Sequence, residues 1–198
     1  MYRFGAIIQA RMGSTRLPGK VLKKIGDKTI LEHVVTRVRE AGIQRIIIAT
    51  SHRHIDEKLK EWAMALGCYF YAGCHEDNVL GRTIDAAEKY NLKHIMRVCA
   101  DNPFLEWRYM TYLWKVWSEL DDSERSYLTY SQFKKGCGVF TEIYNVAYLY
   151  SMREHLKPSS VPPIYLESHY KGPCLSIDTQ EDLKRVRKWY ENSKYNHK

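Results

Sequence analysis

Short apolar runs alternate along most of this chain with longer segments that repeat apolar residues at helical spacing. Phe4 to Ala10 and Ile46 to Ile48 are rich in isoleucine, and such runs are typical of buried strands. The segment from Ile30 to Ala41 has a helical period, and Gly42 follows it as a helix stop. Strands are therefore predicted over residues 4–10, 45–50, 68–72, 95–100, 127–130 and 175–177. Helices are predicted over residues 30–41, 55–66, 79–90, 107–120, 144–155 and 181–190, with a frayed tail over 193–198.

This alternation predicts βαβ units and a mostly parallel sheet covered by helices on both faces. The fold class that follows is α/β, a three-layer Rossmann-like sandwich. The chain has 198 residues, within the range of about 100 to 200 that is usual for one domain. It shows no internal repeat and no low-complexity linker, so residues 1–198 are predicted to form a single domain.

Composition excludes several classes of protein. Hydrophobic residues make up 44% of the chain and charged residues 27%, which excludes disordered, collagen and coiled-coil classes. No apolar run approaches the roughly 20 residues of a membrane-spanning helix, and the N-terminal run is too short for a signal peptide. Five scattered cysteines without a CxxC motif favour free, buried thiols. Together these features predict a cytoplasmic protein.

The net charge of +8 indicates an anionic partner. Nucleic acid, an anionic membrane and a phosphorylated small molecule would all satisfy it. Charge alone does not choose among them, and a solvated cationic surface explains it as well.

The loop after the first predicted strand, Ala10 to Lys20, is the most informative stretch. Loops at the carboxyl ends of parallel strands are where α/β proteins bind ligands. Arg11, Arg16 and Lys20 would together neutralise a polyphosphate, and Gly13 lets the backbone approach a ligand closely. The spacing fits neither the Walker loop nor the GxGxxG dinucleotide loop. From composition alone, a solvated surface loop is an equal alternative.

Two carboxylates are predicted at the same edge of the sheet. Asp101 follows the fourth predicted strand, and Asp178 follows the last one. The pair suits Mg²⁺, which typically takes one or two protein carboxylates and fills its octahedron with water and phosphate oxygens. Asp101 could instead be a turn residue, and Asp178 could cap the last helix. Thr179 with Asp182 could also provide that cap while Asp178 points at a metal.

The stretch from Ile7 to Lys20 resembles the signature of the sugar-acid cytidylyltransferases, which include the CMP-Kdo and CMP-sialate synthetases. The nearest resemblance is to the SpsF-type proteins of spore-coat and surface polysaccharide synthesis. Further matching segments follow in the same order along nearly the whole chain, at residues 30–34, 45–50, 77–82, 100–105 and 175–183. Their combination outweighs the solvated-loop alternative.

The resemblance implies a GT-A-like nucleotidyltransferase fold and Mg²⁺-dependent transfer of CMP from CTP onto a sugar or sugar acid, with release of pyrophosphate. The product would serve the synthesis of a surface polysaccharide or another glycan. The residues implied for catalysis are Arg11, Lys20 and Asp101. Those implied for nucleotide binding are Ala10, Arg11, Gly13, Ser14, Arg16, Lys20 and Arg82. The implied metal ligands are Asp101 and Asp178, and Glu142 and His169 match positions on the acceptor side.

Two other functions stay open. A glycosyltransferase of related fold would consume a nucleotide sugar, and SpsF-type proteins are sometimes described that way. Such an enzyme usually relies on an Asp-x-Asp metal motif, which this sequence lacks. A non-catalytic nucleotide- or RNA-binding module is suggested only by the net charge.

The sequence departs from its relatives in two places. Ser51 stands where relatives often carry Asp. The chain is also shorter between Asp121 and Phe140, a region that helps form the sugar pocket and the dimer contacts in the relatives. The acceptor and the oligomeric state are therefore undecided. The expected partners are CTP and a small sugar or sugar-acid acceptor, with neither nucleic acid nor a membrane, and a homodimer stays open.

Overall fold

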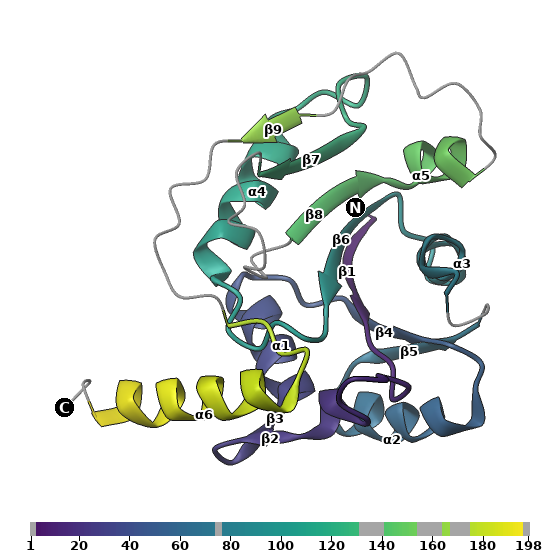
Figure 1. Ribbon diagram of the computed structural model, residues 1–198. Helices are drawn as coiled ribbons and strands as arrows, with labels where there is room; N and C mark the ends of the chain where they lie inside the picture. Colours follow the sequence, from purple (N-terminus) through teal and green to yellow (C-terminus); the bar gives the residue numbers. More distant parts are fainter. Residues whose placement is uncertain (1–2, 74–76, 131–140, 154–163, 167–174, 196–198) are drawn as a thin grey trace.

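A mostly parallel sheet forms the centre of the protein (Figure 1). The computed structural model describes residues 3–73, 77–130, 141–153, 164–166 and 175–195. Within these residues the sheet has seven strands in the order β5-β4-β1-β6-β8-β7-β9. The strands are β1 (Phe4–Gln9), β4 (Ile46–Thr50), β5 (Tyr69–Ala72), β6 (His94–Cys99), β7 (Tyr127–Tyr130), β8 (Thr141–Asn145) and β9 (Ile164–Leu166). Strands β5, β4, β1 and β6 run parallel to their neighbours in this set, whereas β8 is antiparallel to both β6 and β7.

Helices cover both faces of the sheet, which confirms the predicted three-layer α/β sandwich (Figure 1). They are α1 (Ile30–Glu40), α2 (Lys58–Ala65), α3 (Val79–Lys89), α4 (Trp107–Glu119), α5 (Val146–Arg153) and α6 (Gln180–Tyr195), with short 3-10 helices η1 (Lys20–Leu22) and η2 (His54–Asp56). Alternate residues of β1 point to opposite faces, as a strand requires. Ala6 and Ile8 pack in the core with α1, α2 and α4, whereas Ile7 packs in the core with α3 and α5.

A third apolar cluster attaches the last helix beside the first loop. It joins Leu17 of that loop to Ile25 of a small hairpin and to Leu183 and Val186 of α6. The hairpin consists of β2 (Lys24–Ile25) and β3 (Lys28–Thr29), which the periodicity did not predict. Helix α6 is therefore held to the segment that follows the first loop, although the two lie at opposite ends of the sequence.

The structure differs from the sequence-based prediction at two strands. The helix predicted over 144–155 is preceded by β8, and α5 begins only at Val146. The strand predicted over 175–177 is absent: Leu175 and Ile177 are buried in the third cluster instead of joining the sheet. An apolar run of this length is equally consistent with a packed, extended loop, and here the loop packs against α6.

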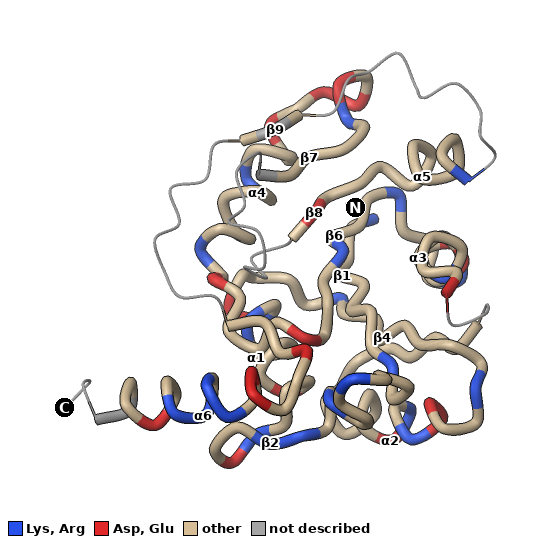
Figure 2. Tube along the Cα trace, in the orientation of Figure 1, with Lys and Arg blue, Asp and Glu red and all other residues tan. Residues whose placement is uncertain are grey.

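Helix α6 is longer than predicted. It runs to Tyr195, so residues 193–195 are helical where a frayed tail was expected. Figure 2 shows Lys and Arg in the middle of α6, flanked by Asp and Glu toward its ends. Among the described residues, no helix combines the length and the apolar character needed to cross a bilayer.

Substitution of a glycine in the turn between β2 and β3 can test whether α6 packs against this hairpin. Gly26 and Gly42 both have left-handed φ angles, 64° and 85°, where an Ala costs about 1 kcal/mol of backbone strain. A Cβ at Gly26 would also lie 2.5 Å from Cε1 of Tyr190, whereas a Cβ at Gly42 would meet nothing within 4 Å. We expect Gly26→Ala to lower the free energy of unfolding by about 1 kcal/mol or more beyond the loss in Gly42→Ala, measured by urea denaturation. Equal losses would contradict the packing of α6 on the hairpin.

Candidate active site

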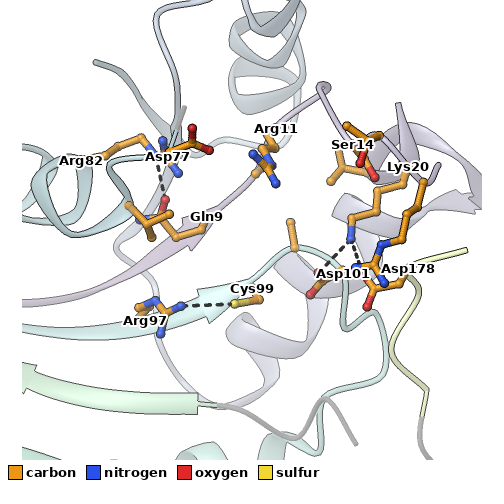
Figure 3. A pocket seen from close by; sticks show the side chains of 16 residues that line it. Gln9, Arg11, Ser14, Lys20, Asp77, Arg82, Arg97, Cys99, Asp101 and Asp178 are labelled. Carbon is orange, nitrogen blue, oxygen red and sulfur yellow. Dashed lines mark hydrogen bonds and ion pairs between the residues drawn. The ribbon is translucent and has the colours of Figure 1, made fainter. Parts of the chain in front are cut away.

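A cavity of about 350 Å³ opens where the predicted site residues converge (Figure 3). It lies at the carboxyl ends of β1 and β6, between the first loop, the start of α3 and the segment before α6. The predicted residues that line it are Ala10, Arg11, Ser14, Arg16, Lys20, Arg82, Asp101 and Asp178. Gly13 and Glu142 do not line it, and His169 lies outside the described residues.

The ammonium of Lys20 joins the two carboxylates (Figure 3). Its Nζ atom donates to Oδ2 of Asp101 at 2.9 Å, to Oδ1 of Asp178 at 3.0 Å and to the carbonyl oxygen of Ile177 at 3.1 Å. The Lys20 side chain is 12% exposed, so this contact lies inside the cavity wall and not in open solvent. Two carboxylates that are far apart in the sequence therefore converge on one cation.

Two arginines add positive charge around that contact. The Nη2 atom of Arg16 lies 3.0 Å from Oδ1 of Asp178, although the Arg16 side chain is 65% exposed. Arg11 also lines the cavity, and in Figure 3 it lies between Lys20 on one side and Arg82 on the other. Five cations and three carboxylates line the cavity as a whole, and the excess of positive charge favours an anionic ligand; they are Arg11, Arg16, Lys20, Arg82 and Arg97, with Asp77, Asp101 and Asp178.

Backbone hydrogen bonds and one glycine give the first loop its shape. The amide of Ala10 donates to the carbonyl of Ala49 at 3.0 Å, which continues the β1–β4 pairing into the loop. The amide of Gly19 donates to the carbonyl of Met12 at 3.0 Å. Gly19 has a φ of 65°, the left-handed region that glycine adopts without penalty. The chain then enters η1, whose first residue is Lys20, so the turn directs that side chain toward Asp101 and Asp178.

A buried carboxylate that the sequence analysis missed anchors the same loop. Asp56, at the end of η2, is 1% exposed. Its Oδ1 accepts from the amide of Met12 at 2.6 Å, and its Oδ2 accepts from the hydroxyl of Ser51. Ser51, which the sequence analysis singled out, is thereby tied to an acid five residues further along. In the sequence, Asp56 is only an acid in the first turn of a predicted helix.

Arg82 is held on the opposite side of the cavity. Asn78 caps α3 by accepting from the amide of Gly81 at 2.8 Å, and Arg82 follows in the first turn. Its Nε donates to Oε1 of Gln9 at 2.8 Å, and Nε2 of Gln9 donates to the hydroxyl of Thr83 at 2.8 Å. With 2% exposure Arg82 is fixed, so it is a preorganised wall of the cavity and not the solvated surface arginine that its sequence position alone would suggest.

Glu142 acts on the cavity only through a neighbour. It lies opposite Arg97 in the β6–β8 register and forms an ion pair with it, and the Tyr127 hydroxyl donates to its Oε1 at 3.0 Å. Arg97 lines the cavity and also donates to Sγ of Cys99 at 3.9 Å. Burial, chiefly, raises the pKa of Cys99 to about 11, so its thiol is neutral near pH 7. Glu142 therefore positions Arg97, and sequence reasoning missed both Arg97 and Cys99.

The two described cysteines confirm one part of the prediction and not the other. Cys68 and Cys99 are free thiols, as expected, but both are half-buried instead of fully buried. Burial also raises the pKa of Cys68, which opposes ionisation of that thiol. The other three cysteines lie outside the described residues.

In the segment before α6, the residues that cap the helix differ from the residue that faces the cavity. Thr179 accepts from the amide of Asp182 at 3.1 Å, and Asp182 accepts in return from the amide of Thr179 at 3.0 Å. This reciprocal pair caps the helix. Asp178 is not needed for that cap, and its side chain turns toward Lys20 and Arg16. The amide of Ile177 donates to the carbonyl of Asp101 at 2.9 Å, which holds the two carboxylate-bearing segments together.

The side chains of the cavity can be compared with the ligands that a metal ion requires. In the part of the chain that the structure describes, no three His, Cys, Asp or Glu residues gather as a metal-binding group. Asp101 and Asp178 both contact a single cation, the Lys20 ammonium, so their oxygens already converge on one point. A pair of carboxylates beside a cation-lined cavity fits Mg²⁺, whereas a zinc site would need more protein ligands.

Comparisons with known proteins bear on the family and the fold. The family model described as Cytidylyltransferase matches residues 5–154. The spore coat polysaccharide biosynthesis protein SpsF of Bacillus subtilis is 29% identical, over 94% of this chain and 86% of its own. The structure of a cytidylyltransferase from Leptospira borgpetersenii superposes with a TM-score of 0.83 at 26% identity, covering 94% of this chain and 86% of that one. A CMP:2-keto-3-deoxy-manno-octonic acid synthetase complexed with CTP shares the fold, with a TM-score of 0.75 at 17% identity and coverage of 96% and 99%.

The role of Asp56 can be separated from a purely local effect by a pair of neighbouring substitutions. Asp56→Ala removes the acceptor for the Met12 amide, so the first loop should lose its fixed position. We expect the affinity for nucleoside triphosphate, measured by calorimetry, to fall about tenfold or more, because small displacements of positioning groups are costly. Glu57→Ala, at the next and exposed position, is the control and should bind like the wild type. Equal affinities in both variants, with normal circular dichroism, would remove Asp56 from the site.

Proposed function

The chain belongs to the cytidylyltransferase family, and we propose that it transfers CMP from CTP onto a sugar or sugar acid, with release of pyrophosphate. It is a nucleotidyltransferase enzyme. We further propose that its product enters the synthesis of a surface polysaccharide or another glycan. SpsF, the relative from Bacillus subtilis, carries a polysaccharide biosynthesis name, and this supports the assignment.

One observation carries the proposal. Arg11, Arg16 and Lys20 from the first loop meet Asp101 and Asp178 around one cavity at the carboxyl edge of the sheet. A triphosphate needs several cations at once, and the cavity provides them on one loop. A site for a neutral ligand would gain nothing from three adjacent cations, so the charge pattern supports a nucleoside triphosphate.

The proposed reaction is an in-line displacement at the α-phosphorus of CTP. A hydroxyl oxygen of the acceptor forms the new bond to that phosphorus, and the bond to the bridging oxygen on its far side breaks. Pyrophosphate leaves with that oxygen and its electron pair, and the acceptor proton passes to solvent or to a nearby base. Arg11, Arg16 and Lys20 would bind the phosphate oxygens and stabilise the negative charge that builds on the leaving group.

Asp101 and Asp178 would hold Mg²⁺ in this proposal. The ion supplies charge neutralisation and polarisation of the phosphoryl oxygens when it is bound. The Thr179–Asp182 cap leaves the Asp178 carboxylate available for that role, because it satisfies the start of α6 without it.

The acceptor would lie on the side of the cavity formed by Arg97 and Cys99, away from the first loop (Figure 3). Arg97 is held by Glu142, and a fixed guanidinium orients a polyhydroxylated ligand by directed hydrogen bonds. Glu142 would therefore serve the acceptor indirectly, and the role of His169 stays a prediction from the resemblance.

The assignment can be tested by following pyrophosphate release with each of the four nucleoside triphosphates against a panel of sugars and sugar acids. We expect CTP with one acceptor class to support turnover, and the other triphosphates to be poorer substrates. Turnover of a nucleotide sugar, without release of pyrophosphate from any triphosphate, would instead support the glycosyltransferase alternative. Binding of short RNA below micromolar concentration, with no turnover at all, would support the binding-module alternative.

If the two carboxylates hold one metal ion, the losses of turnover in their single variants should not add in the double variant. Asp101→Asn and Asp178→Asn should each lower turnover by about 100-fold, and the double variant should be little worse than the worse single. Asp182→Asn is the control, because it removes a carboxylate from the cap and not from the cavity. Turnover is measured against Mg²⁺ concentration. An Asp178→Asn enzyme with normal turnover and unchanged Mg²⁺ dependence would leave Asp101 as the only candidate ligand.

A further inference from the structure

We propose that Lys20 occupies the place of the divalent cation in the nucleotide-free enzyme, so that a metal ion binds there only after nucleotide has drawn Lys20 away. This inference rests on the metal role proposed above for Asp101 and Asp178. It adds an order of binding. The carboxylates do not bind a free metal ion while Lys20 contacts them, and they become available once the triphosphate has bound Lys20.

The contacts of the ammonium are those of a bound cation. A lysine ammonium has three N–H donors, and here each has an oxygen partner. The partners are Oδ2 of Asp101 at 2.9 Å, Oδ1 of Asp178 at 3.0 Å and the carbonyl of Ile177 at 3.1 Å. The lysine is thus fully coordinated by oxygen, including one atom of each proposed metal ligand.

A metal ion and the ammonium compete for the same oxygens. A metal ion placed between Oδ2 of Asp101 and Oδ1 of Asp178 would lie where the ammonium now lies, and at contact distance the two cations would repel each other. With side-chain exposures of 12%, 31% and 39% for Lys20, Asp101 and Asp178, solvent screens this repulsion only in part. The two states of the site are therefore mutually exclusive.

The charges also favour exchange by a metal–nucleotide complex over entry of a free ion. Lys20 and Arg16 together balance the two carboxylates, so the nucleotide-free cluster is close to neutral. A free Mg²⁺ would add two uncompensated charges. A triphosphate brings oxygens that Lys20 and Arg16 can bind instead, and its negative charge compensates both those cations and the metal. Lys20 is well suited to such a move because its ammonium is carried on a flexible stem.

The test measures metal binding directly and without nucleotide. Mn²⁺, which suits the same oxygen ligands, is titrated into the protein at pH 8 and the free ion is followed by electron paramagnetic resonance. Lys20→Met removes the charge but keeps an unbranched side chain of similar length. We expect Lys20→Met to bind one Mn²⁺ about tenfold or more tightly than the wild type. The same substitution should abolish turnover, so the variant gains metal affinity while it loses activity.

Matched variants make the result specific. Lys28→Met, the same substitution at an exposed position on β3, should bind Mn²⁺ like the wild type. Adding Asp101→Asn to Lys20→Met should remove the gain, because it removes one of the two carboxylates that Lys20 vacates. If Lys20→Met does not fold, Lys20→Gln, which is also uncharged and keeps a polar end, is expected to show the same gain.

Unchanged Mn²⁺ affinity in a folded, uncharged Lys20 variant would overturn the inference, as would a gain that survives Asp101→Asn. Neither outcome depends on the nucleotide or the acceptor, because neither is present in the titration. A wrong substrate assignment would therefore appear only in the pyrophosphate assay, and a wrong view of Lys20 only in the Mn²⁺ titration.

Discussion

The site depends on the ion contacts of Lys20 with Asp101 and Asp178. These residues are separated by 81 and 158 positions in the sequence, and they come from the first loop, the end of β6 and the segment before α6. Each segment is positioned by its own local structure: the Gly19 turn, the parallel pairing of β6 with β1, and the cap of α6. The backbone hydrogen bond from the Ile177 amide to the Asp101 carbonyl directly joins the two segments that carry the acids. The ammonium thus contacts both of the other two segments and holds the three parts of the site together.

Much of the fold could be predicted because its signals are local. The isoleucine-rich runs of β1 and β4 are buried on both faces of the sheet, which is why they read as nearly continuous apolar sequence. The cap formed by Thr179 and Asp182 was also predictable, since a capping pair needs only residues three apart. The first loop lies where a parallel strand ends, and its cations face the cavity that this position indicates.

What the sequence could not supply is tertiary. Strand β8 is short and runs directly into α5, so its last two residues fell within the predicted helix and the rest was assigned to no element. Its place between β6 and β7 depends on distant partners. Asp56 carries no motif, and its contact with Met12 exists only because η2 folds back under the first loop. Arg97 likewise becomes part of the cavity through its pairing with Glu142 on β8.

The raised pKa of Cys99 has a consequence for the durability of the enzyme. The thiolate is the form of cysteine that reacts with peroxides and other oxidants, and with a pKa of about 11 only about one thiol in ten thousand is ionised at pH 7. Cys99 lines the cavity, and its neutral thiol reacts slowly with such oxidants. The burial that keeps this side chain neutral therefore places a polarizable, compact group in the cavity wall without adding a redox-sensitive one.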